Sequence, residues 1–243
     1  MKIRVETAAR LHMGFVDLHG GLGRRFGSLG VGLKEPRLIL EATAAPELTS
    51  EGPGAERALE FADCFFDAFA PHGERPYDGA HLRILETIPP HVGLGSGTQL
   101  ALAVGTALAR LNGTDVDPAS LAVAMGRGRR SRMGIGSFEA GGFMVDGGRS
   151  TDGDALAPIL LRHTLPSDWL FVVVTPEVAP GLSGEREDQA FDDLTRPSED
   201  LAGRIARLLV MSMLPALMER NIKRFGAAVT DIQRLVGDGF APV

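Results

Sequence analysis

A glycine-rich turn between a predicted strand and a predicted helix constrains the fold of this chain more than any other feature. Residues 89–99 read Pro-Pro-His-Val-Gly-Leu-Gly-Ser-Gly-Thr-Gln, and residues 80–88 before them show a strand pattern. Residues 100–111 are rich in strong helix formers, and Asn112 with Gly113 would end that helix. This strand–turn–helix unit is typical of a mixed α/β or α+β domain.

The turn has the composition of a phosphate-binding loop. Glycines allow backbone conformations that are closed to other residues, and they let main-chain N–H groups approach an anion without a Cβ atom in the way. The following helix adds unpaired N–H groups and the positive end of its dipole. The predicted phosphate-binding residues of the turn are Gly93, Gly95, Ser96, Gly97, Thr98 and Gln99. The alternative is a turn that only packs a helix on a sheet. The turn is not a Walker loop, because no lysine follows the last glycine.

The remaining pattern predicts two domains, at residues 1–165 and 166–243. In the second, residues 170–174, Leu-Phe-Val-Val-Val, have the composition of a buried strand. Other strands are expected over residues 2–8, 37–41 and 143–145, the last of which leads into a turn at Asp146 and two glycines. Other helices are expected over residues 59–69, 118–125, 199–213 and 216–236. Asp117 would cap the helix over residues 118–125, and Pro215 would end the helix over residues 199–213. One strand and two helices cannot readily cover both faces of a sheet, so we expect the second domain to be shortened or to borrow a partner.

A cluster of arginines stands out in an otherwise acidic chain. Arg127, Arg129, Arg130 and Arg132 lie within six residues of a sequence whose formal net charge is −6. Guanidinium groups bind phosphate and carboxylate oxygens through paired N–H donors, so we add Arg127, Arg129 and Arg130 to the predicted phosphate-binding residues. The alternative is a solvated helix end whose dipole the arginines oppose.

Charge and composition argue against several classes of protein. An acidic chain is repelled by nucleic acids and by anionic membranes. No window approaches about 18 unbroken apolar residues, and the N-terminus lacks a signal-peptide pattern. The single cysteine, Cys64, lies among phenylalanines and is expected in the core. We predict a cytoplasmic protein that binds neither nucleic acid nor membrane.

Three sequence blocks resemble one enzyme family. Pro89-x-x-x-Gly-Leu-Gly-Ser is similar to the phosphate loop of GHMP small-molecule kinases, and its continuation, Gly-Thr-Gln-Leu-Ala-Leu-Ala, resembles that of the β-ribofuranosylaminobenzene 5′-phosphate synthases of the same superfamily. Residues 9–18 and 126–148 are similar to two further blocks of that family, in the same order, and residues 181–191 match more weakly. The resemblance implies a GHMP-kinase-like α+β fold, with an N-terminal mixed α/β domain and a shortened C-terminal α+β domain.

The resemblance also implies an activity. Phosphoribosyl pyrophosphate would condense with a benzoic acid, usually p-aminobenzoate, with loss of CO₂ and pyrophosphate, in tetrahydromethanopterin biosynthesis. Mg²⁺ and arginines would stabilise the leaving group. The resemblance does not assign the residues that would bind the metal. Residues 134–137, Gly-Ile-Gly-Ser, lack the aspartate with which kinases of this superfamily activate their substrate, which argues against phosphoryl transfer.

Four residues are predicted to take part in catalysis or substrate positioning. They are Arg10, His12, Asp17 and Glu139. Alternatives are a structural role for His12, a turn with Gly20 and Gly21 for Asp17, and a solvated position for Glu139.

Two other functions are kept as alternatives: an ATP-dependent small-molecule kinase, and a non-catalytic protein that binds a phosphorylated ligand. Because the family continues past the equivalent of residue 243 into another glycine-rich segment, we expect an incomplete second domain. Its exposed apolar surface would favour a homodimer.

Overall fold

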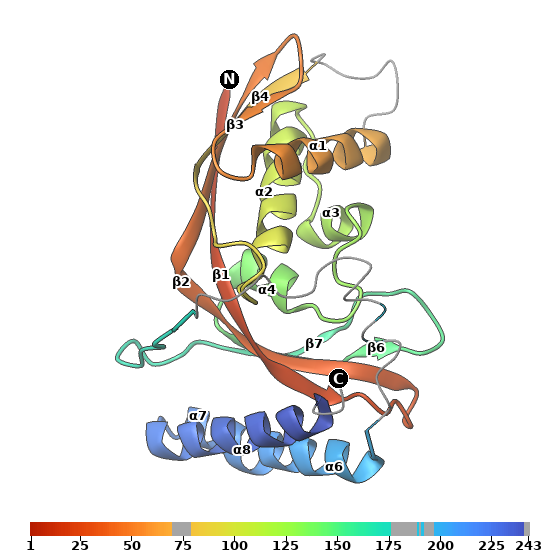
Figure 1. Cartoon of the computed structure of the whole chain (residues 1–243), viewed down its shortest axis with the longest axis vertical. Coiled ribbons are helices and arrows are strands. Elements are labelled where there is room, and N and C mark those ends of the chain that lie inside the picture. Colours follow the sequence, from red (N-terminus) through yellow and green to blue (C-terminus); the bar gives the residue numbers. More distant parts are fainter. Residues whose placement is uncertain (70–78, 176–188, 190, 192–196, 241–243) are drawn as a thin grey trace. The chain divides into compact units, whose positions relative to one another are not determined.

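The computed structural model describes residues 1–69, 79–175, 189, 191 and 197–240 (Figure 1). These residues form two compact units. Unit 1 comprises residues 1–11, 32–129 and 134–141, and unit 2 comprises residues 12–31, 130–133 and 142–243. The units interleave along the chain because two long strands, β1 (Lys2–Asp17) and β2 (Arg24–Ala45), contribute residues to both.

The sheet of unit 1 is built on the C-terminal half of β2. This half pairs antiparallel with β4 (Gly79–Glu86), so that Ala42 lies opposite Leu82, and β3 (Thr49–Glu51) adds to β4 in parallel. Leu38, Leu40 and Ala42 are fully buried at every second position, as expected for a strand with one face on the core.

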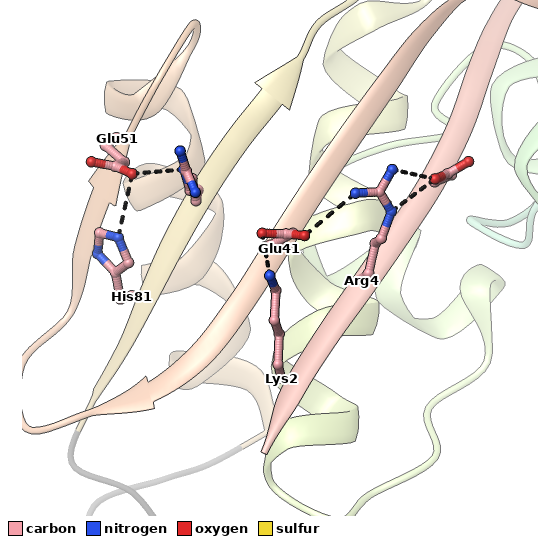
Figure 2. Close-up of polar contacts among 7 residues, drawn as sticks. Lys2, Arg4, Glu41, Glu51 and His81 are labelled. Atoms are coloured by element: carbon pink, nitrogen blue, oxygen red, sulfur yellow. Dashed lines mark hydrogen bonds and ion pairs between the residues drawn. The ribbon is translucent and has the colours of Figure 1, made fainter.

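Ion pairs cover part of this sheet. Figure 2 shows Glu41 of β2 between Lys2 and Arg4 of β1, at 2.7 and 3.3 Å, while Glu51 pairs with Arg83 at 3.0 Å. The hydrogen bond from Lys2, followed by its charge and by Arg4, lowers the pKa of Glu41. The carboxylates and cations of this surface therefore neutralise one another.

Four helices belong to unit 1: α1 (Ala55–Phe69), α2 (Ser96–Leu111), α3 (Pro118–Ala124) and α4 (Met133–Ala140). In Figure 1, α1, α2 and α3 stack beside the strands, and α2 is buried along most of its length. The predicted cap of α3 is confirmed, since Asp117 accepts a hydrogen bond from the Ser120 N–H at 3.0 Å. Cys64 is exposed, so its predicted core position is wrong: α1 turns its other face, with Phe61, Phe65 and Phe66, inward.

The helix after the glycine turn begins earlier than the sequence predicts. α2 starts at Ser96 rather than at residue 100, so residues 96–99 form its first turn. α4 was not predicted, because glycines at two of its eight positions weaken the helical pattern.

The strands of unit 2 extend the N-terminal half of β2. β5 (Phe143–Asp146) pairs with β2, with Val145 opposite Leu29, and β7 (Ile159–His163) pairs with β5. β6 (Arg149–Ser150) also pairs with β2.

Over residues 199–240, unit 2 contains α6 (Glu199–Leu208), the π-helical turn η1 (Leu209–Met213), α7 (Leu214–Met218) and α8 (Ile222–Phe240). The prediction that Pro215 ends the first helix is wrong. The chain stays helical through it, and the wider turn η1 lies just before the proline, which lacks an N–H donor.

Residues Glu199–Met218 are long and apolar enough to cross a membrane by length and composition, with a mean hydropathy of 1.5. Within this stretch Ile205, Leu209, Met213 and Leu217 are buried in unit 2 at a spacing of four residues. That spacing is typical of a helix packed on one side in a globular protein.

The predicted buried strand over residues 170–174 is wrong. These residues have no regular secondary structure, and Leu170, Val172 and Val174 are 84%, 89% and 82% exposed. A strand needs a hydrogen-bonded neighbour, and no described strand pairs with this segment.

Candidate active site

The glycine turn before α2 adopts a backbone that favours glycine. Gly93 and Gly95 both have φ of 80°, in the left-handed region, and Gly95 is the N-cap of α2 without a side-chain cap. Because L-residues with a Cβ atom are strained there, glycine is the residue that fits at these positions. We call residues 93–99 the cradle.

The first turn of α2 keeps two N–H groups open. The Gly95 carbonyl accepts hydrogen bonds from the N–H groups of Thr98 and Gln99, at 3.1 and 3.2 Å. For Ser96 and Gly97, no backbone or side-chain acceptor among the described residues bonds to the N–H. The N-terminus of a 16-residue helix thus presents donors in the arrangement that binds phosphate in other proteins.

Arg10 lies against the cradle. Its backbone N–H donates to the Leu94 carbonyl at 3.1 Å, and its Nη1 donates to the Gly93 carbonyl. A Cβ atom on Gly95 would lie 3.2–3.3 Å from Arg10 side-chain atoms, so glycine is also needed here for the close approach. The structure therefore brings one of the four predicted catalytic residues to the predicted phosphate-binding residues.

Two more arginines reach the cradle from other helices and loops. A Cβ atom on Gly97 would lie 3.7 Å from Nη1 of Arg127 and 2.8 Å from Nη2 of Arg57. Both guanidinium groups lie over the ring of Phe61, with Cζ 4.8 Å from its centroid for Arg127 and 6.0 Å for Arg57. Sequence reasoning missed Arg57; the only local signal was its position four residues before Phe61 on α1, which places the two side chains on one helix face.

Gln99, the last residue of the cradle, connects it to two other elements. Its side chain is fully buried; Oε1 accepts a hydrogen bond from the Thr7 hydroxyl, and Nε2 donates to the Gly134 carbonyl at 2.8 Å. These bonds join α2 to β1 and α4. Thr98, one residue earlier, touches Gly134, since a Cβ atom there would lie 2.9 Å from Thr98 Cγ2.

The other arginines of the cluster have different surroundings. Arg129 is exposed, and its Nη2 would lie 3.7 Å from a Cβ atom on Gly126. Arg130 belongs to unit 2, where its Cζ lies 4.3 Å from the ring centroid of Phe191. These residues are close along the chain, but Arg127 contacts Phe61 in unit 1 and Arg130 contacts Phe191 in unit 2.

Asp146, a buried carboxylate that the sequence analysis missed, binds residues 131–132 at the end of the arginine cluster, within unit 2. Asp146 accepts hydrogen bonds from the N–H groups of Ser28, Gly148 and Arg132 at 2.9, 3.0 and 2.9 Å. Burial raises the pKa of Asp146, and the hydrogen bonds from Arg132, Gly148 and Ser28 oppose that effect. The sequence places Asp146 between a predicted strand and two glycines, a pattern that predicts only a turn residue.

His12 and Asp17 lie in unit 2. His12 Nδ1 accepts a hydrogen bond from the Gly14 N–H at 3.2 Å, and its ring lies 4.6 Å from that of Phe15. Asp17 Oδ1 accepts hydrogen bonds from the N–H groups of His19 and Gly20, at 2.8 and 2.9 Å. Asp17 therefore closes a turn, as its alternative role predicted, and a catalytic role for either residue stays a prediction.

Glu139 is exposed near the C-terminal end of α4 and lines a pocket of about 530 Å³ with Thr106, Arg110 and Asp117. Thr106 lies nine residues after Gly97 on α2, about 14 Å along the helix axis. This pocket is thus a separate place from the cradle, and a catalytic role for Glu139 stays a prediction.

No group of three or more histidine, cysteine, aspartate or glutamate side chains within the described ranges could hold a metal ion. The cradle supplies N–H and hydroxyl groups and its neighbouring arginines supply guanidinium groups, but the cradle has no carboxylate, so its residues do not form a Mg²⁺ site of their own.

The comparisons with known proteins agree on a family. Residues 57–138, which include most of α1, all of α2 and α3 and most of α4, match the GHMP kinases N terminal domain. The chain is 35% identical to the β-ribofuranosylphenol 5′-phosphate synthase of Archaeoglobus fulgidus, over 96% of this chain and 76% of that protein. It is 33% identical to the protein of the same name in Methanothermobacter thermautotrophicus, over 99% and 77%. The chain belongs to the β-ribofuranosylphenol 5′-phosphate synthase family. It is an enzyme of the GHMP superfamily, as the sequence blocks indicated.

Solved structures of this superfamily share the fold. Streptococcus pneumoniae phosphomevalonate kinase superposes with a TM-score of 0.68 at 16% identity, covering 98% of this chain and 80% of that one. Leishmania major mevalonate kinase gives a TM-score of 0.63 at 12% identity, covering 98% and 76%. At such identities these likenesses establish the GHMP-kinase-like α+β fold and not the reaction.

Proposed function

We propose that this synthase joins the anomeric carbon of phosphoribosyl pyrophosphate to the ring of a para-substituted benzoate, with release of pyrophosphate and CO₂. The observation that carries the proposal is that Arg10 contacts Gly93 and Gly95, and Arg127 lies beside Gly97, in a cradle whose Ser96 and Gly97 N–H groups are open. The chain belongs to a ribofuranosyl phosphate synthase family. A substrate that carries a 5′-phosphate and a pyrophosphate needs such a concentration of donors.

The bond changes balance without a further reactant. The bond between the anomeric carbon and pyrophosphate oxygen breaks, and both electrons leave with pyrophosphate. The ring carbon that bears the carboxylate then forms a bond to the anomeric carbon. Loss of CO₂ returns its bonding electrons to the ring and restores aromaticity, so this last step needs no general base.

The residues of the chain contribute charge stabilisation and positioning. Negative charge grows on the phosphate oxygens as the carbon–oxygen bond breaks, and donors that are already in place stabilise that charge without reorganisation. Arg10 is held by the Gly93 carbonyl and Arg127 by the ring of Phe61, so both guanidinium groups are oriented before substrate binds. Mg²⁺ stays a prediction; it would bind through the substrate's phosphate oxygens rather than through cradle carboxylates.

The acceptor is either p-aminobenzoate or its hydroxy counterpart, 4-hydroxybenzoate. The relatives in A. fulgidus and M. thermautotrophicus are named for a ribofuranosylphenol, whose ring carries a hydroxyl group. By the bond changes above, a phenol product comes from a hydroxybenzoate, so we favour 4-hydroxybenzoate over the p-aminobenzoate that the sequence blocks indicated.

Phosphoryl transfer is the second candidate, because the superfamily includes kinases. Residues 134–137 lie in α4, and Gly134 touches Thr98 of the cradle, but this stretch carries no carboxylate to orient a hydroxyl nucleophile. The synthase reaction does not need that group.

The experiment supplies the purified protein with phosphoribosyl pyrophosphate, MgCl₂ and either benzoate, and measures pyrophosphate, CO₂ and the mass of the riboside. We expect pyrophosphate, CO₂ and riboside in equal amounts, with the larger rate for 4-hydroxybenzoate. A folded sample that forms none of them, but converts ATP to ADP with a small alcohol, would replace the proposal by the kinase. Binding of phosphoribosyl pyrophosphate without turnover would replace it by a non-catalytic binder. The tetrahydromethanopterin pathway, a cytoplasmic location and a homodimer stay predictions.

A further inference from the structure

Arg57 is an arginine beside the cradle that the sequence analysis did not single out. It lies in the first turn of α1, and its Nη2 would be 2.8 Å from a Cβ atom on Gly97, closer than Nη1 of Arg127 at 3.7 Å. Gly97 is the second residue of α2 and carries one of the two open N–H groups. The Arg57 guanidinium thus reaches the place where the helix presents its donors.

The surroundings of Arg57 do not explain its position. Among the residues that the structure describes, no carboxylate forms an ion pair with it, and its described partner is the ring of Phe61 at 6.0 Å. Arg127 lies over the same ring at 4.8 Å. The same ring thus contacts both guanidinium groups.

The two arginines reach the cradle from separate segments. Arg57 comes from α1 and Arg127 from the loop after α3, and Phe61, only 5% exposed, is anchored in the core of unit 1. An anchored ring restricts both side chains, so less rotamer freedom is lost when they bind a ligand. A residue that only covered Phe61 would not need to extend to Gly97.

We propose that Arg57 and Arg127 form a two-arginine clamp that binds phosphate oxygens of the sugar substrate above the N–H groups of Ser96 and Gly97. The clamp rests on the proposed function for its substrate class. Its ligand is a phosphoryl group, which the substrate offers both as its 5′-phosphate and as its pyrophosphate.

The experiment measures binding by isothermal titration calorimetry with two probes, inorganic pyrophosphate and ribose 5-phosphate. Arg57→Gln removes the charge, and Arg57→Lys keeps the charge but loses the paired donors of the guanidinium group. Arg83→Gln is the matched control, because Arg83 is also an arginine of unit 1 but pairs with Glu51 on the sheet. Thermal unfolding of each variant shows whether the fold is kept.

We expect Arg57→Gln to bind at least one probe roughly 10- to 100-fold more weakly, because a hydrogen bond to a charged group is lost. Arg57→Lys should recover part of the loss, and Arg83→Gln should stay within about twofold of the wild type, as is usual for an exposed ion pair. The probe whose affinity falls identifies which phosphoryl group the clamp holds. Unchanged affinity of Arg57→Gln for both probes would overturn the clamp.

A second variant tests the same geometry without changing any arginine. Gly97→Ala favours the helix, since alanine is a better helix former than glycine, but its Cβ atom would displace the Arg57 guanidinium. We expect a melting temperature at least equal to that of the wild type, together with weaker probe binding. Full affinity in this variant would contradict the clamp.

The two proposals fail in different ways. If the wild type binds neither probe, the cradle is not a phosphate site, and both the clamp and the proposed function lose their support. If the wild type binds and turns over substrate while Arg57→Gln behaves as the control does, the proposed function stands and the clamp alone is wrong.

Discussion

Replacing Asp146 by asparagine tests whether one buried carboxylate stabilises unit 2 through its hydrogen bonds to Ser28, Arg132 and Gly148. The Asp146 side chain uses Oδ1 to accept from the N–H groups of Ser28 and Gly148. Its Oδ2 accepts from the N–H group of Arg132 and, at 3.4 Å, from the Ser131 hydroxyl. The residue is 1% exposed. Asparagine has nearly the same shape, but only one of its two terminal atoms accepts a hydrogen bond.

The size of the effect follows from counting donors. If the new amide oxygen keeps the bonds from Ser28 and Gly148, its NH₂ group faces the Arg132 N–H, and that donor loses its acceptor. A buried unsatisfied donor costs about 1–3 kcal/mol. The two retained bonds weaken because their acceptor is now neutral, while the desolvation of a carboxylate is no longer paid, so these two changes partly offset each other. We expect the free energy of unfolding to fall by about 2 kcal/mol, which corresponds to roughly 4–8 °C in melting temperature for a chain of this size.

The effect should depend on pH in a defined direction. Burial raises the pKa of Asp146 above that of an unfolded aspartate. A raised pKa means that the folded protein holds this proton more tightly, so the contribution of Asp146 to stability is full below its unfolded pKa and is lost as pH rises through its folded pKa. Asparagine does not titrate. The stability difference between the wild type and Asp146→Asn should therefore be larger below the pKa of an unfolded aspartate than above the raised pKa of the folded carboxyl group.

Urea unfolding can be followed through the single tryptophan, Trp169, which lies in unit 2 with its ring 5.1 Å from that of Phe225. Asp154→Asn is the control, because Asp154 is fully exposed and pairs with Arg149 at 2.9 Å. Equal stability of the two variants would refute the counting of donors. A difference that widens with pH would show that the hydrogen bonds to the carboxylate outweigh its burial.

Two further predictions concern the cradle. Gly95→Ala places a side chain at φ 80° and within 3.2 Å of the Arg10 side chain, so we expect a loss of stability of about 1–2 kcal/mol and weaker binding of pyrophosphate. Thermal unfolding and calorimetry would check both, and unchanged affinity would mean that the turn tolerates a different backbone. Gln99→Leu removes the partners of the Thr7 hydroxyl and the Gly134 carbonyl, and should cost about 2–4 kcal/mol in urea unfolding. A loss below about 0.5 kcal/mol, typical of a surface substitution, would show that these bonds do not hold α2.

Much of the fold could be predicted from local sequence. The strand–turn–helix unit around residues 89–111 and the Asp117 cap of α3 are present as predicted, because capping and glycine conformations depend on neighbours in the chain. The sequence does not predict α4, because glycines at two of its eight positions weaken the helical pattern. Residues 170–174 are wrongly predicted as a strand, because a buried strand needs hydrogen-bonded neighbours as well as apolar residues of its own.

For the candidate site too, some features follow from the sequence and others only from the tertiary structure. The sequence by itself determined the family, the glycine turn and the presence of an arginine cluster, since all three depend on which residues follow one another. Only the tertiary structure decided which arginines meet at Gly97: Arg57, outside the cluster, reaches it with Arg127, while Arg130 lies over Phe191 in the other unit. The packing of α1 against α2 brings Arg57 beside Gly97, and such contacts depend on residues far apart in the chain.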